Sequence, residues 1–287
     1  MPGYDGSLDD RTGYDPDFIG PHIEPPALRD DADAVHVADS PIIKYTRFSV
    51  CLSKSRKLAR WVAWNIDGSS LRKEGDSDTL SRKGLVFKAD PRVDADLQTL
   101  NPVYEDNRLD RGHIARRADL LWGDRKTAQA ANRDSFFLTN VTPQMDNFNE
   151  SRLKGVWGCL ENALLEQVDE SNSKVTVMAG PVLAPTDVPY GTVWIPVEFW
   201  KLLIYQRDNE LRTRGFILKQ KLEGLGPPRR RGPLDRFEMY ERTVDEIAEK
   251  AGVTFDPILQ AAQLRGRRRT RGRVSPAPIT DTRRIEW

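Results

Sequence analysis

One stretch constrains the fold and the chemistry of this chain more than any other. It is the tetrapeptide Asp110-Arg111-Gly112-His113, read together with the segment from Asn140 to Glu161. His113 is one of only three histidines in 287 residues, and the other two, His22 and His36, lie in a Pro- and Asp-rich leader without hydrophobic periodicity. Because the unperturbed pKa of histidine is about 6.5, its side chain can accept a proton near neutral pH. If a histidine does chemistry in this protein, His113 is the candidate, and the fold must bring the later polar residues to it.

The length of the chain allows one domain of about 200–250 residues with additional arms. Its longest apolar runs, such as 175–179, are far shorter than a membrane span. The acidic, polar beginning of the sequence does not resemble a secretory signal peptide. Cys51 and Cys159 lie within apolar patterns, which favours reduced core thiols over a disulfide. We therefore expect a cytoplasmic protein without membrane association.

The net charge of +1 excludes a basic field over the whole molecule, but the charge is unevenly placed. Residues 265–284 contain eight arginines and one acid, whereas the first forty residues are rich in Asp. Such asymmetry often accompanies nucleic-acid binding, and a solvated tail or a tail packed on the core is the alternative. We divide the chain into an extended N-terminal arm (1–40), a central domain (41–260) and an Arg-rich C-terminal tail (261–287).

Helical and strand patterns alternate without the regularity of βαβ units, so the predicted class is α+β. The strongest helical pattern lies at 149–166, where apolar residues recur every three or four positions. The remaining expected helices are 124–132 and 244–251, and the expected strands are 44–52, 58–66, 85–88, 136–138, 175–179, 193–204 and 214–218.

The polar residues suit the cleavage of a phosphodiester bond. That reaction requires a base for the attacking water, and positive charge for the phosphorus and the leaving oxygen. Mg²⁺ takes oxygen ligands and keeps several waters, so one amide oxygen can suffice as its protein ligand. The guanidinium of Arg111 matches a phosphate. Each residue alone also has a structural explanation: a turn histidine, a helix-capping asparagine, a solvated glutamate.

The combination of motifs is more specific than its parts. The DRGH tetrapeptide is followed by TNVTPQ, which contains Asn140, and then by Asn149, five residues after Gln144. A W-x-x-L-E motif, from Trp157 to Glu161, lies in the expected helix. ARWVAWNI at 59–66, Gly180-Pro181 and IPVEFWKLLI at 195–204 flank these motifs. From about Tyr45 to about Asp256 the sequence resembles the DNA/RNA non-specific endonuclease family, of the Serratia nuclease and mitochondrial endonuclease G type.

This resemblance implies a ββα-metal nuclease core, with a mixed, mainly antiparallel sheet flanked by helices. It implies Mg²⁺-dependent endonucleolytic cleavage of DNA, and by extension RNA, with 5′-phosphate ends and with Mn²⁺ as a substitute metal. His113 would be the general base, Asn149 the direct metal ligand and Glu161 the holder of metal-bound waters. Arg111 would contact phosphate, and Asn140 would support the loop at His113. A homodimer or a regulatory protein partner is left open.

Two departures from the family pattern affect the assignment of residues. The segment between Asn149 and Trp157 is four residues longer than in the best-known members, so 151–155 should form an extra turn; Asn149 remains the preferred ligand over Asn147. Direct spacing places Leu85 where the family has an arginine before Asp-Pro at 90–91. The basic residues left as replacements or further phosphate contacts are Arg82, Lys83, Lys88, Arg92, Arg116 and Arg117.

Two other functions remain open from the sequence. A nucleic-acid-binding or scaffold module could keep this fold without activity, although His113, Asn149 and Glu161 are all present. A phospholipase or another phosphodiesterase could use the same histidine and metal. Bacterial members of the family act as effectors in toxin and anti-phage systems, which makes a defence or toxin role a further hypothesis.

Overall fold

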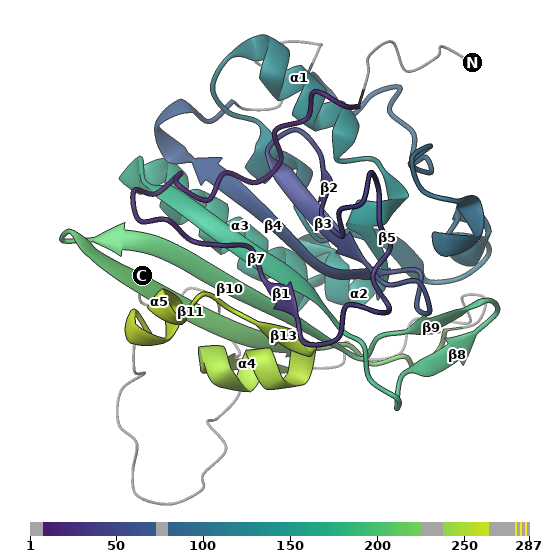
Figure 1. Ribbon diagram of the computed structural model, residues 1–287. Helices are drawn as coiled ribbons and strands as arrows, with labels where there is room; N and C mark the ends of the chain where they lie inside the picture. The colour runs from purple at the N-terminus through teal and green to yellow at the C-terminus, as the bar shows by residue number, and fades with distance from the viewer. Residues whose placement is uncertain are drawn as a thin grey trace, which may run out of the picture.

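The chain folds around a seven-stranded antiparallel sheet. The computed structural model describes residues 8–72, 80–225 and 238–263, together with Ile279, Thr282 and Ile285. The strand order is β12-β11-β10-β7-β4-β3-β2, and every neighbouring pair is antiparallel (Figure 1). These strands are β2 (Ile43–Lys44), β3 (Phe48–Leu52), β4 (Ala59–Asp67), β7 (Lys174–Val182), β10 (Glu198–Arg207), β11 (Glu210–Lys219) and β12 (Glu238–Arg242).

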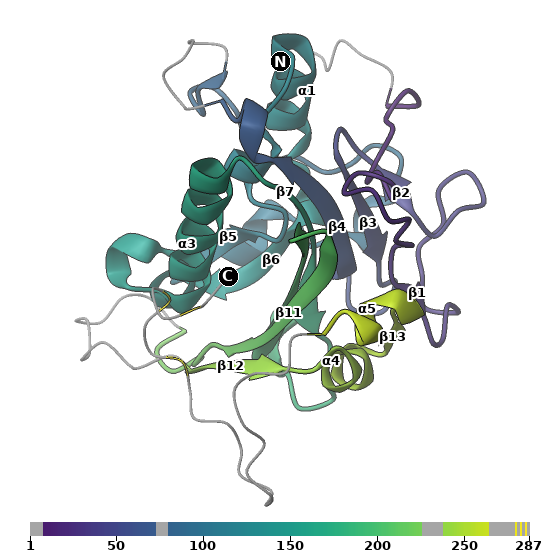
Figure 2. The same ribbon diagram turned by 90° about the vertical axis from the view of Figure 1, so that its left-hand side faces the viewer.

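Both faces of this sheet are covered, which is why its central strands β4, β7 and β10 are almost continuously apolar. One face packs against α3 (Val156–Ser171) in the larger hydrophobic cluster, which includes Trp157 and Leu160. The other face packs against α4 (Val244–Ala251) and α5 (Pro257–Ala261) in a second cluster. Figure 2 shows α3 and α4 on opposite sides of the strands.

The smaller elements complete the two layers. Strand β1 (Ala27–Leu28) pairs with β13 (Val253–Thr254), and β8 (Val188–Tyr190) pairs with β9 (Val193–Ile195). Helix α1 (Arg125–Asp134) begins at Asp124, whose carboxylate accepts a hydrogen bond from the Thr127 amide, as its acidic N-cap predicts. Single 3₁₀ turns occupy 68–70, 95–97, 101–104, 117–120, 138–140 and 151–153.

A separate two-stranded antiparallel sheet and a short helix stand on the face of the main sheet that carries α3. Strand β5 (Leu109–His113) pairs with β6 (Val141–Met145), so that Asp110 lies opposite Gln144 and His113 opposite Val141. The short helix α2 (Asp146–Asn149) follows β6 directly, and α3 comes next. This β-β-α arrangement confirms the predicted α+β class and gathers the motif residues of the sequence into one unit.

Several predicted elements have different bounds. The strand expected at 44–52 is two strands, because Arg47 adopts a left-handed φ of 72° between them. The strand expected at 136–138 was wrong: those residues enter a 3₁₀ turn, and the strand begins at Val141. Residues 85–88 form no strand and contribute only a single bridge from Lys88 to Phe137. The helix expected at 149–166 begins only at Val156.

The two ends of the described chain reach the same domain. Arg11 forms an ion pair with Asp134 (2.7 Å), at the end of α1. Ile285 is buried in the larger cluster, and the Ile279 amide donates to the Met239 carbonyl of β12 (2.7 Å). The arginines predicted to form a basic tail lie outside the described residues. Within the described ranges, no helix has the length and apolar character that crossing a bilayer requires.

Candidate active site

The DRGH motif is a β-strand, and its glycine has a steric reason. A Cβ at Gly112 would overlap the side chain of Gln144, which lies in the neighbouring strand β6. Glycine at this position therefore allows β5 and β6 to pair while the Gln144 side chain packs against the backbone of Gly112. Because alternate residues of a strand point to opposite faces, Arg111 and His113 project to the same side of β5.

His113 lies against an aromatic wall. Its ring meets Phe136 edge-on (centroids 5.5 Å apart) and Phe87 at 5.2 Å. Burial, and then the positive charges of Arg82, Arg117 and Arg116, lower the pKa of His113 to about 3, against a weaker opposing effect of a hydrogen bond with the Ser135 backbone. The imidazole is therefore neutral at neutral pH.

The free nitrogen of His113 is Nε2. This atom is buried and has no hydrogen-bond partner among the described residues. The hydrogen bond with the Ser135 backbone therefore belongs to Nδ1, which donates, so that Nε2 carries the lone pair. A neutral imidazole with an unused acceptor nitrogen is the state that a general base requires.

Asn140 is fully buried and ties the chain together behind His113. Its Oδ1 accepts from the Ala115 amide (2.9 Å), and its Nδ2 donates to the carbonyls of Ala115 (3.0 Å) and Ser135 (3.2 Å). The same residues, Ser135 and the segment after His113, are thus held by one side chain. This geometry suits the loop-supporting role predicted for Asn140.

The extra residues between Asn149 and α3 form a compact turn. A 3₁₀ turn at 151–153 is followed by Lys154 in the left-handed conformation (φ 61°). Gly158, in the first turn of α3, packs on the Asn149 carbonyl so closely that a Cβ there would overlap it. The insertion therefore loops out and returns the chain to Asn149, as the spacing of the sequence predicted.

The amide of Asn149 is oriented by the DRGH strand. Its Nδ2 donates to Oδ2 of Asp110 (3.0 Å), which leaves the amide oxygen as the group that can bind a ligand. Asn147, the alternative ligand, also offers an oxygen: its Oδ1 is buried without a hydrogen-bond partner among the described residues. Contact with the DRGH strand distinguishes Asn149.

Glu161 is buried rather than a solvated residue of the helix surface. Its Oε1 lies 3.2 Å from Nζ of Lys201, and its Oε2 lies 3.9 Å from Nε of Arg116. Lys201 was not among the predicted site residues. It is completely buried in β10, and its ammonium stacks on Trp157 (4.0 Å to the ring centroid). A lysine within the apolar run FWKLLIY was the signal that could have identified it.

A second buried carboxyl, Asp119, belongs to the same group. Its Oδ2 accepts a hydrogen bond from Nε1 of Trp64 (3.2 Å), and it is fully buried. Burial raises the pKa of Asp119 to about 7; Arg116 and Lys201 oppose this shift, and Glu161 adds to it. Asp119, Glu161, Arg116 and Lys201 therefore form one electrostatic network beside His113.

The predicted phosphate-binding residues have different partners. The guanidinium of Arg82 lies 5.7 Å from the ring centroid of Phe136, which touches His113. Arg111 donates to Oδ1 of Asn101 (2.7 Å). The ammonium of Lys88 lies over Phe137 (4.5 Å), and Asp134 is the charge with the largest effect on its pKa, which burial lowers.

Of the proposed replacements for the family's arginine, Arg82 is the one beside the histidine. Arg92 instead forms an ion pair with Asp90 (2.7 Å), and its guanidinium stacks on Tyr45 (4.8 Å to the centroid). Arg82 contributes more than the other two arginines to the low pKa of His113. Among the basic residues that the sequence offered for phosphate binding, Arg82 is therefore the one whose position suits that role.

The donor set fits a single hydrated hard cation and does not fit a metal held by several protein ligands. No group of three or more His, Cys, Asp or Glu in the described part of the chain could hold a metal ion. The amide oxygen of Asn149 and the carboxylate of Glu161 offer few protein oxygens, and at a site of that kind Mg²⁺ keeps most of its waters.

The chain matches known proteins over most of its length. The family model described as DNA/RNA non-specific endonuclease matches residues 33–262. Human mitochondrial endonuclease G is 26% identical over 227 residues, which cover 75% of this chain and 69% of that protein. Nuclease C1 of Cunninghamella echinulata var. echinulata is 26% identical over 230 residues, or 76% of this chain and 83% of that protein.

Two further comparisons concern length and fold. An uncharacterised protein, y4fB, of Sinorhizobium fredii is 33% identical over 298 residues; the match covers 96% of this chain but only 44% of y4fB. A crystal structure of the EndoG/EndoGI complex, which concerns the mechanism of EndoG inhibition, contains a chain with the same fold (TM-score 0.57, 20% identity, 76% of this chain and 86% of that one). This chain belongs to the DNA/RNA non-specific endonuclease family: the family model matches most of it, and its fold and its motif residues on β5, β6 and α3 agree with that match.

Proposed function

We propose that this protein is a Mg²⁺-dependent endonuclease that hydrolyses phosphodiester bonds of DNA and RNA, with His113 as the general base. The observation that carries the proposal is the state of His113: a neutral, half-buried imidazole whose buried Nε2 has no partner among the described residues, with the charges of Arg82, Arg116 and Arg117 acting on it. A base beside positive charges suits an anionic substrate, because the phosphate balances those charges when it binds.

Each protein group has one task in this scheme. Nε2 of His113 takes a proton from the attacking water. Arg82 and Arg116, which lie close enough to His113 to lower its pKa, hold the non-bridging oxygens of the phosphate as negative charge develops. Asn140 keeps the backbone after His113 in place through Ala115.

The metal would be held by the amide oxygen of Asn149, with the Glu161 carboxylate accepting hydrogen bonds from its waters. A hydrated Mg²⁺ there supplies positive charge for the phosphate and the leaving oxygen, and Mn²⁺ has the same preference for oxygen ligands. Asp110 orients the Asn149 amide, and Lys201 and Arg116, at 3.2 Å and 3.9 Å from its two carboxylate oxygens, orient Glu161. The substrate is nucleic acid, whose phosphodiester the groups of the site suit. Contacts to phosphate alone do not read the base sequence, so we expect cleavage without sequence preference at these groups.

Replacing each asparagine in turn separates the two possible ligands. We expect Asn149→Ala to weaken Mg²⁺ binding and plasmid cleavage together, because the direct ligand is lost. Asn147→Ala, the matched control in the same short helix, should keep both. Calorimetric titration with Mg²⁺ and a plasmid nicking assay measure the two properties. An active Asn149→Ala beside a dead Asn147→Ala would place the metal on Asn147 instead.

A further inference from the structure

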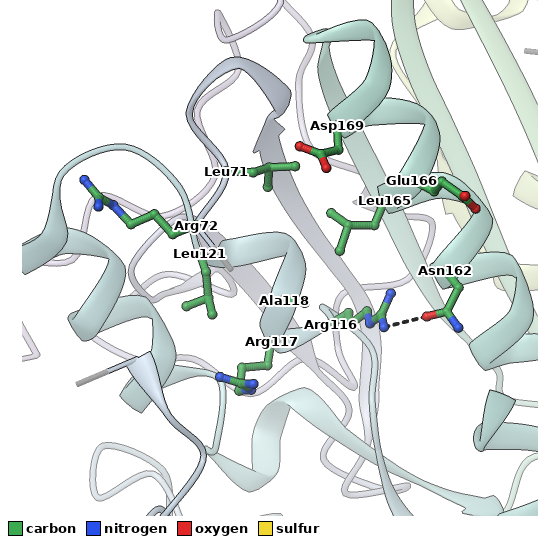
Figure 3. Close-up of a pocket in the computed structure, with 10 residues that line it drawn as sticks. All are labelled: Leu71, Arg72, Arg116, Arg117, Ala118, Leu121, Asn162, Leu165, Glu166 and Asp169. Atoms are coloured by element: carbon green, nitrogen blue, oxygen red, sulfur yellow. Dashed lines mark hydrogen bonds between the residues drawn. The ribbon is translucent and has the colours of Figure 1, made fainter. Parts of the chain in front are cut away.

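A groove of about 440 Å³ lies next to Glu161, between α3 and the chain after β5. Figure 3 shows Leu121 and Leu165 on opposite sides of it, with Arg116 and Arg117 towards one end and Asp169 at the other. Its remaining lining residues are Leu71, Arg72, Ala118, Asn162 and Glu166. The groove therefore has apolar walls, a basic end and an acidic end.

The basic end of the groove is shared with the candidate active site. Nε of Arg116 lies 3.9 Å from Glu161, and its Nη2 donates to Oδ1 of Asn162 (2.6 Å) in the groove wall. Its Nη1 is buried with no hydrogen-bond partner among the described residues. Arg116 and Arg117 both lower the pKa of His113, so this end lies within electrostatic reach of the proposed base. A phosphate bound at His113 would thus lie beside the entrance of the groove.

The far end of the groove indicates what kind of group fits there. Asp169 and Glu166 line it together with Leu165, so a second phosphate would meet negative charge and apolar surface. A neutral, flat group with apolar faces and a polar edge avoids both penalties. A nucleobase has this character, and its amino groups can donate to a carboxylate.

We propose that this groove binds the nucleobase that neighbours the phosphate being cleaved, a role that rests on the proposed nuclease function. The phosphate lies at the Arg116 end, and the base lies against the half-buried Leu165 and Leu71. A base that is paired and stacked in a duplex cannot enter such a groove unless it leaves the stack. The groove therefore favours single-stranded DNA and RNA, whose bases are free to turn outward.

Binding of mononucleotides tests the groove without any requirement for cleavage. 2′-Deoxycytidine 5′-monophosphate and 2′-deoxycytidine 3′-monophosphate, whose base carries an amino group, are titrated into the protein in the presence of Mg²⁺, beside 2-deoxyribose 5-phosphate, which lacks the base. We expect at least one nucleotide to bind about tenfold or more tightly than the sugar phosphate, because the base adds apolar burial against the leucines of the groove. Equal affinities for all three compounds would overturn the proposal.

Variants assign the binding to this groove. Leu165→Glu places a charge in the apolar wall, and Leu165→Trp fills the groove while keeping an apolar side chain on α3. Both should abolish the advantage of the nucleotide over the sugar phosphate. The matched control is Leu211→Glu, at another half-buried leucine that packs in the cluster on the opposite face of the sheet. An advantage that survives in both Leu165 variants would contradict the assignment.

A substrate without a base separates this inference from the proposed function. Bis(4-nitrophenyl) phosphate contains a phosphodiester and no nucleobase. The Leu165 variants should hydrolyse it at the wild-type rate but should lose about tenfold in kcat/KM on a single-stranded oligonucleotide. Equal losses on both substrates would sink the base-binding role. If the wild type hydrolysed neither substrate, the nuclease proposal would fail, whereas the nucleotide titration would still decide whether the groove binds a base.

Discussion

Lys201 is a charged residue in one of the most apolar places of the molecule. Its ammonium is fully buried between Trp157 and Glu161. Removing a lysine from water costs several kcal/mol, and well-packed apolar residues often serve stability as well as a buried ion pair does. Stability alone therefore does not explain this lysine. Its contact with Oε1 of Glu161 (3.2 Å) points instead to a role in orienting that carboxylate.

Lys201→Met tests this positioning role. We expect Mg²⁺ affinity to fall by roughly 10–100-fold, as with other groups that orient the surroundings of a metal. Calorimetric titration of the folded variant, checked by circular dichroism, gives the affinity. Lys174→Met, in the neighbouring strand β7, is the control because Lys174 lies over Phe18 and away from Glu161. Wild-type Mg²⁺ affinity in Lys201→Met would leave the lysine with a packing role only.

Sequence reasoning found the residues that lie within short motifs and missed those that meet them across the fold. His113, Asn149 and Glu161 stand in recognisable spacings along the chain. Lys201 and Asp119 reach Glu161 only because the sheet and the segment after β5 pack against α3. No spacing in one sequence encodes such a contact, although a lysine inside an apolar strand is a signal that a charge has a buried partner.

At the scale of elements, the joint between α2 and α3 sets the position of the proposed metal ligand. The sequence predicts one helix over 149–166, but the chain there forms the end of the short helix α2, a 3₁₀ turn and then α3. The apolar positions at helical spacing start only at Val156, where α3 begins, so the periodicity carried no information about residues 149–155. The length of the insertion did predict the extra turn. Gly158 then allows the first turn of α3 to contact the Asn149 carbonyl.

Gly158→Ala should disturb this joint. The added Cβ would overlap the backbone oxygen of Asn149, so the chain there must move. Because small misplacements in an active site cost large factors in rate, we expect cleavage to fall by about 10²-fold while α3 remains folded. Cys159→Ala, at the next position of α3, is the control and should retain activity. Plasmid nicking and thermal melting distinguish the two variants, and a fully active Gly158→Ala would show that the close contact is not needed.

At the scale of the whole molecule, the far end of the chain returns to the core. The sequence left open whether the Arg-rich tail contacts nucleic acid or packs on the domain. Ile285, beyond those arginines, is only 4% exposed and belongs to the same hydrophobic cluster as α3. The packing alternative therefore holds at this point of the tail. Charge patterns alone could not show it, because an isolated isoleucine carries no periodicity.

Ile285→Ala measures what this contact contributes. Removing a buried isoleucine side chain typically lowers the free energy of unfolding by about 2–5 kcal/mol. Urea denaturation should show such a loss, with catalytic activity retained because Ile285 is not among the residues of the proposed active site. Ile258→Ala is the control, since Ile258 is 39% exposed. If both variants were equally stable, the end of the chain would contribute nothing to the core.

The central claim is that His113 and a divalent cation together cleave phosphodiester bonds. The most direct test is digestion of plasmid DNA and of RNA by the purified protein, with Mg²⁺ or with EDTA, beside a folded His113→Ala variant. We predict cleavage of both nucleic acids with Mg²⁺, none with EDTA, and a rate about 10²–10⁴-fold lower in His113→Ala, as the loss of a general base implies. Cleavage that continues in EDTA, or at the wild-type rate without the imidazole of His113, would contradict it.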